Sequence, residues 1–222
     1  MVLKTTLVIL GLSTLVSANP YFINTPKIPF NFGNHITGDY FSEYIYANQQ
    51  KRVVFEVLIK DVDISEWTQD GMSGHWFAFG LDRVQDNDIH WDLIMCEFKY
   101  NPSDPHNEMH CSDSIWDNDE WWNEDQYQES AFIDSQKITF DQENKKVTFK
   151  LDIVKRFHTP IGHQDTVITD GSEVKITWMY GSMEAGFPVF RKSGSKRGNA
   201  VIKLDNLDEY LAIENAKHHE DL

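Results

Sequence analysis

One stretch of this chain gathers aromatic rings and polar side chains of the kind that hold sugars. Residues 115–127 place four aromatic side chains among Asp, Asn, Glu and Gln: Trp116, Trp121, Trp122 and Tyr127. Aromatic faces stack on the apolar faces of pyranose rings, and carboxylates and amides form directional hydrogen bonds with hydroxyl groups. The stretch therefore predicts a site for a glycan or a similar small polar ligand. The aromatic side chains could instead belong to the core, and on a regular strand Trp121 and Trp122 would face opposite sides, so that at most one enters any given pocket.

Two acidic loops, one inside this stretch and one before it, offer oxygen ligands that suit calcium. They contain Asp117 and Asp119, and Asp86 and Asp88. Hard cations prefer such oxygens, but neither loop has the spacing of an EF-hand. Because acidic runs are more often solvated turns, these four side chains are weak calcium candidates and no metal is assigned.

Residue types that catalysis needs do not occur in diagnostic arrangements. The chain has no Gly-x-Ser-x-Gly elbow and no Cys–His pair with an orienting group. His158 and His163 could hold a metal, but their spacing is not diagnostic and no third ligand is placed. Pairs of acids could carry out glycoside chemistry. On balance the sequence predicts a binding protein and not an enzyme.

The two cysteines predict a disulfide within a hairpin. Cys96 and Cys111 lie symmetrically about residues 100–105, whose Asn, Pro, Ser and Asp are strong turn formers. A hairpin folded at that turn would place the two side chains opposite each other on adjacent strands, within bridging distance. The alternative is two buried free thiols.

Hydrophobic periodicity predicts that short strands position all of these side chains. Residues 52–60 alternate, with Val53, Phe55, Val57 and Ile59 on one face. Further strands are predicted at 91–100, 108–116, 137–140, 146–151, 174–180 and 199–204, and a short helix at 207–218. Many short strands with polar turns between them indicate an antiparallel sandwich or barrel.

The N-terminus and the composition place the protein in the secretory pathway. Residues 1–18 combine a charged start, an apolar run and a small-residue exit, which predicts a signal peptide. No later segment predicts a membrane span. The net charge of −15 disfavours nucleic acid as a partner. Residues 219–222 are similar to the His-Asp-Glu-Leu retrieval signal with the two acids exchanged, so the destination is either extracellular or the lumen of the endoplasmic reticulum.

Residues 74–82, 149–159 and 174–181, each with the residues that follow it, together resemble DOMON domains. The first is residues 74–82, an aromatic strand that reaches a Gly, followed by Asp92. The second is 149–159, a strand with basic residues and then Thr159, followed by Asp165. The third is 174–181, followed by Arg197, Gly198 and an apolar strand. The resemblance covers residues 38–205, so that 19–37 become an N-terminal extension and 206–222 a charged tail.

The resemblance implies an all-β, immunoglobulin-like antiparallel β-sandwich of about ten strands, with a pocket that binds b-type haem or sugars. The family's axial Met and His are missing from residues 83–90 and 188–193, so haem is not assigned as a cofactor. A haem site would need His90 with Met183 or His75.

The prediction is a non-catalytic binding module for a glycan or similar polar ligand, with Trp76 of the first segment as a fifth candidate contact. The alternatives are a divergent haem-binding electron-transfer domain and a structural or protein-interaction domain. No protein partner is identified.

Overall fold

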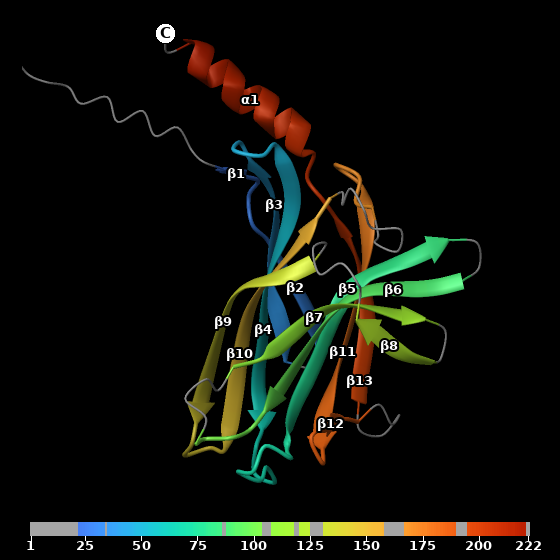
Figure 1. Ribbon diagram of the computed structural model, residues 1–222. Coiled ribbons are helices and arrows are strands. Elements are labelled where there is room, and N and C mark those ends of the chain that lie inside the picture. Colours follow the sequence, from blue (N-terminus) through green and yellow to red (C-terminus); the bar gives the residue numbers. More distant parts are fainter. Residues whose placement is uncertain are drawn as a thin grey trace, which may run out of the picture.

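The computed structural model describes residues 22–33, 35–85, 88–103, 108–117, 120–124, 131–157, 167–189 and 195–220. These residues form two antiparallel β-sheets and one helix (Figure 1). Sheet A contains β1 (Phe22–Asn24), β2 (Ile28–Gly33), β3 (Ile36–Ile45), β4 (Gln50–Asp63), β9 (Ala131–Asp141) and β10 (Lys146–Arg156). Sheet B contains β5 (Gly74–Gln85), β6 (Asp88–Lys99), β7 (His110–Asp117), β8 (Glu120–Glu124), β11 (Glu173–Glu184), β12 (Phe187–Pro188) and β13 (Ser195–Lys203). The predicted all-β sandwich is confirmed.

The main core lies between the two sheets, and β4 and β10 of sheet A contribute apolar residues to it at alternate positions. The central strands of sheet B are buried on both faces, and residues of their other face form a second cluster. On β4 the side chains Val53, Phe55, Val57 and Ile59 are buried, which confirms the predicted face. These β4 side chains pack with residues at alternate positions of β10, which is in the same sheet, and of β5 and β6, which are in the facing sheet. Each fully buried side chain of this size contributes about 1.5–3 kcal/mol through apolar area removed from water.

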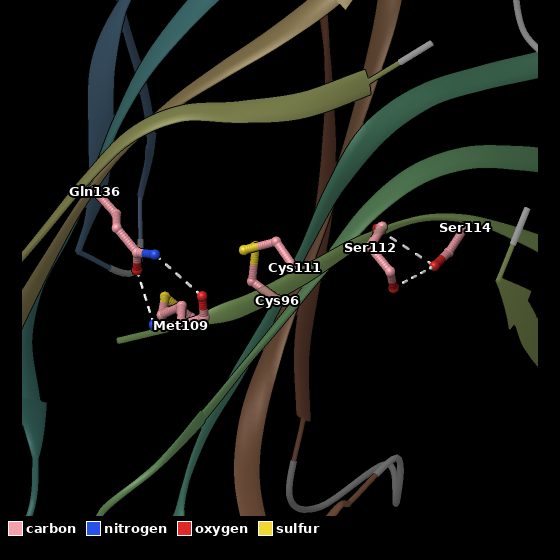
Figure 2. Close-up of a disulfide and its surroundings, with 6 residues drawn as sticks. All are labelled: Cys96, Met109, Cys111, Ser112, Ser114 and Gln136. Atoms are coloured by element: carbon pink, nitrogen blue, oxygen red, sulfur yellow. Dashed lines mark hydrogen bonds between the residues drawn. A yellow bond between two sulfur atoms is a disulfide. The ribbon is translucent and has the colours of Figure 1, made fainter. Parts of the chain in front are cut away.

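Both predicted hairpins are present. β6 pairs with β7 in a register that places Cys96 opposite Cys111, and the two are joined by a disulfide with a Cα–Cα distance of 4.0 Å (Figure 2). The disulfide prediction is therefore confirmed. β9 and β10 form the second hairpin around the turn at residues 142–145.

Segments at both ends of the chain join the sandwich. β1 and β2 both pair with β3, so residues that precede the expected domain boundary belong to sheet A. Helix α1 (Leu207–Glu220), predicted as a short helix, projects from one end of the sandwich (Figure 1). The Asp170 carboxylate accepts the backbone N–H groups of Leu207 at 2.7 Å and Asp208 at 3.1 Å. These bonds satisfy donors that a helix N-terminus leaves open.

No helix in the described part of the chain is long and apolar enough to cross a membrane. The predicted signal peptide, residues 1–18, lies outside the described residues. So do Asp221 and Leu222 of the predicted retrieval signal.

Candidate functional site

Sheet B brings four tryptophan positions together on three adjacent strands. Trp91 of β6 is the register partner of Trp116 of β7. β8 pairs with β7 on the other side, with an irregularity between the pairs of Ile115 and Asp117. There, Trp121 and Trp122 of β8 stand opposite Trp116. We call these positions the tryptophan ladder: Trp91, Trp116, Trp121 and Trp122. Their backbone is described and their side chains are not.

The β8 irregularity changes what the sequence implies about Trp121 and Trp122. A regular strand would send neighbouring side chains to opposite faces, which would allow only one of the two to enter a pocket. The pair Ile115–Asn123 and the pair Asp117–Glu120 leave two residues of β8 opposite one of β7. A bulge of this kind interrupts the alternation. The alternation rule therefore does not show which of the two tryptophan side chains could enter a pocket, or that only one could.

Trp91 is the ladder position that the sequence reasoning missed. The signal was available, because the hairpin axis that pairs Cys96 with Cys111 also pairs Trp91 with Trp116. Directly opposed residues on antiparallel strands have Cβ atoms about 4.5–5.5 Å apart. The ladder thus extends the predicted aromatic group by one strand.

Trp76 lies apart from the ladder. It is fully buried in a cluster separate from the main core, formed with Ala78, Leu93, Met95, Met179 and Met183. Such burial is typical of a packing residue. A contact between Trp76 and a ligand stays a prediction.

The remaining predicted site residues are only partly described. Tyr127, Asp86 and Asp119 lie outside the described residues. Asp88 and Asp117 lie in β6 and β7, where their side chains are not described. Within the ranges that the structure does describe, no three His, Cys, Asp or Glu side chains are grouped to hold a metal.

A buried ion pair joins the two sheets next to the ladder. Lys155 of β10 donates from Nζ to Oδ2 of Asp92, which follows Trp91 on β6, at 2.6 Å. The two side chains are 5 % and 2 % exposed. A cavity of about 10 Å³ lies beside them, lined by Phe55, Phe79, Leu81, Ile94, Ala131 and Ile153 among others, and this is the space that one water molecule needs.

The ion pair connects two of the segments that carry the DOMON resemblance. Asp92 is the acid that follows the first segment, and Lys155 lies on the basic strand of the second. Burial of each charge costs several kcal/mol, which the attraction between the partners offsets only when their geometry is good. We infer that the pair fixes how the two sheets meet at the end of the core where β6 continues into the ladder.

A groove of about 430 Å³ lies between β9, the edge strand of sheet A, and residues 110–113 of β7, which precede the part of β7 that pairs with β8. Two side chains span it. The Gln136 amide accepts the backbone N–H of Met109 at 2.8 Å and donates to its carbonyl at 3.1 Å (Figure 2). The Asp113 carboxylate accepts the backbone N–H of Ala131 at 3.0 Å. Because these bonds take the place of a strand pairing, the two edges are joined while a recess remains between them.

The register separates the residues that a haem site would need. His75 pairs with Phe98, which lies at the opposite end of β6 from His90. At about 3.4 Å per residue of antiparallel strand, His75 and His90 are more than about 25 Å apart. Met183 pairs with Gly74, which is further still from His90. Neither combination can place two ligands on one iron.

His75 is a core residue whose ring is kept neutral by burial. Its ring stacks on Phe149 with centroids 5.8 Å apart, and its Nε2 has no hydrogen-bond partner among the described residues. Burial lowers the pKa of His75 from 6.5 to about 3, because the charged ring would lose its hydration.

The low pKa of His75 predicts a loss of stability in acid. Below pH 6.5 the unfolded chain binds a proton at His75 that the folded protein does not bind, so the free energy of unfolding falls as the pH decreases from 6.5 towards 3. The loss approaches about 1.4 kcal/mol per pH unit. Urea unfolding at a series of pH values should show a weaker pH dependence in His75→Phe than in the wild type. The difference should reach roughly 1.5 kcal/mol between about pH 6.5 and pH 5.

The exposed His110 provides the matched control, since His110→Phe removes an imidazole that remains in solvent. This variant should keep the pH dependence of the wild type. Equal pH dependences for His75→Phe and the wild type would refute the assignment of the acid sensitivity to His75.

Comparison with known proteins adds no relative. No model of a known protein family matches the chain, and no curated protein matches it.

Proposed function

We propose that the protein is a non-catalytic, DOMON-like binding module of the secretory pathway, whose tryptophan ladder binds a glycan or a similar polar ligand. The observation that carries this proposal is the register of β6, β7 and β8, which gathers four tryptophan positions on neighbouring strands. The register concentrates four of the chain's seven tryptophans on three neighbouring strands, which is the residue type that stacks on sugar rings.

The ladder has the dimensions and the neighbours that a sugar site needs. Adjacent strands lie about 4.8 Å apart, so three strands span about 10 Å, which is close to the length of two linked pyranose rings. Asp117 and Glu120 pair at the end of the β7–β8 hairpin, directly beside the ladder positions. Acidic side chains accept hydrogen bonds from hydroxyl groups. The proposed site thus combines residue types that stack on sugar rings with residue types that form hydrogen bonds with hydroxyl groups.

The disulfide supports the proposed location. Disulfides form and persist in oxidising compartments such as the endoplasmic reticulum and the extracellular space. The Cys96–Cys111 bond therefore agrees with the signal peptide that residues 1–18 predict.

Ladder variants should lose ligand binding without loss of fold. A panel of oligosaccharides is screened for changes in tryptophan fluorescence, and the best ligand is measured by calorimetry. Trp91→Ala and Trp122→Ala should each weaken its binding by about tenfold or more, since one stacked aromatic ring contributes on the order of 1–3 kcal/mol.

The control is Phe187→Ala, which removes an aromatic ring that is 74 % exposed on β12, away from the ladder. This variant should bind as the wild type does. A broad panel without a ligand, or ladder variants that bind normally, would overturn the proposal.

A further inference from the structure

We propose that the groove between β7 and β9 is a second binding site, which takes an organic cation: an ammonium or guanidinium group on an aliphatic chain. The groove holds about 430 Å³. Sites for small molecules are concave and measure about 300–1,000 Å³. The groove is formed by other residues than the tryptophan ladder, so this site does not depend on the proposed glycan function.

The groove wall combines apolar side chains with acids. Ile94 and Met109 line the groove but are almost fully buried. Its accessible apolar surface belongs to Phe132, Ile133 and the disulfide at Cys111, which are only partly buried. An aliphatic chain would remove this surface from water, at about 25 cal/mol per Å² of apolar area buried. The polar side carries the carboxylates of Asp113 and Asp134, with the Ser135 hydroxyl and the Gln136 amide.

The charge of the groove favours a cationic ligand over a neutral or anionic one. Two of the lining residues are acids and none of the described lining residues is Lys, Arg or His. On the adjacent strand β10, Lys155 donates to Asp92 at 2.6 Å, and Arg156 lies 5.7 Å from the ring of Phe132, which lines the groove. A cleft lined by one sign of charge concentrates the field in its interior. The net charge of −15 adds to this field.

The fold gives Asp134 a position from which it can act on a ligand. β10 pairs Asp152 with Ser135 and Ile153 with Ile133, so Asp134 is an extra residue of β9 in a bulge. Bulges re-aim side chains and interrupt strand pairing. Asp134 is exposed, whereas Asp113 is 2 % exposed and is bonded to the backbone of Ala131. Asp134 can therefore be changed without disturbing a buried bond.

The test is isothermal calorimetry of the full chain with cadaverine and with tetralysine, and with 1,5-pentanediol as the neutral analogue. Binding of either cation, together with weaker or no binding of the diol, is expected. Asp134→Lys should weaken cation binding by about tenfold or more, because it replaces the negative charge at the ligand with a positive one. Asp134→Asn should weaken binding by less, because it only removes the negative charge. Cadaverine binding assigns the site to free amines, and binding of tetralysine alone assigns it to basic peptide side chains.

The matched control is Glu143→Lys, which changes the net charge equally at an exposed position of the β9–β10 turn. It should bind the cations within about twofold of the wild type, as distant rim charges contribute little. Equal losses in Glu143→Lys and Asp134→Lys would overturn the proposal in favour of general attraction by the acidic protein. Equal binding of the diol, or no binding of either cation, would overturn it as well.

Discussion

Replacement of Lys155 by Met should lower the free energy of unfolding by about 3–5 kcal/mol. The variant leaves the Asp92 carboxylate buried at 2 % exposure without the ammonium group that now lies 2.6 Å from it. A buried charge without its partner retains the cost of desolvation and loses the attraction that offsets it. Urea unfolding at neutral pH measures the difference.

Two further variants separate the ion pair from a general effect of the substitution. The double variant Asp92→Leu, Lys155→Met removes both charges and should recover most of the loss, because apolar residues of similar volume often replace a buried pair without cost. Lys27→Met breaks the ion pair with Glu56, in which Lys27 is 53 % exposed, and should cost less than about 1 kcal/mol. If Lys155→Met lowered the free energy of unfolding no more than Lys27→Met does, the account in which the buried pair holds the two sheets together would be wrong.

Removal of the disulfide should lower the free energy of unfolding by about 3 kcal/mol. The bond closes a short loop and so reduces the conformational entropy of the unfolded chain. The bond joins residues 15 apart in the sequence. Alanine is the suitable replacement, since Cys96 is fully buried and a serine hydroxyl at that position would need a hydrogen-bond partner. The Cys96→Ala, Cys111→Ala double variant is compared with the oxidised wild type by urea unfolding.

Single variants provide the internal control for this prediction. Cys96→Ala and Cys111→Ala each open the same bond, so either loss, measured with the remaining thiol kept reduced, should nearly equal that of the double variant. Additive losses would show that packing of the individual side chains, and not the bond, stabilises the protein. A loss below about 1 kcal/mol would contradict the chain-entropy account of the bond.

Local patterns were enough to predict the two hairpins and the strands β4, β6, β7, β9, β10, β11 and β13, but not β1, β2, β3, β8 or β12. β4 and β10 alternate buried and exposed side chains along their length, and this period is visible in the sequence. The turn-forming residues at 100–105 predicted the β6–β7 hairpin, whose register places Cys96 opposite Cys111. Each of these features depends on residues that are close in the chain.

Contacts between distant segments could not be predicted in the same way. Asp92 and Lys155 are 63 residues apart and meet only because sheet A and sheet B stack. The groove between β7 and β9 exists because the edge strand of sheet A faces the part of β7 that precedes its pairing with β8, and Gln136 and Asp113 join the two. The bulge of β8 opposite Trp116 is a matter of register, which alternation alone does not specify.

The nuclear magnetic resonance signals of the tryptophan indole N–H groups test the ladder most directly. The chain has seven tryptophans, so a ¹⁵N-labelled sample gives one assignable indole signal for each. Addition of the best oligosaccharide from the panel should shift the signals of Trp91, Trp116, Trp121 and Trp122. The signal of Trp178, which is 3 % exposed in the interior, should stay in place. Unchanged ladder signals at a saturating concentration of a bound oligosaccharide would contradict the proposed site.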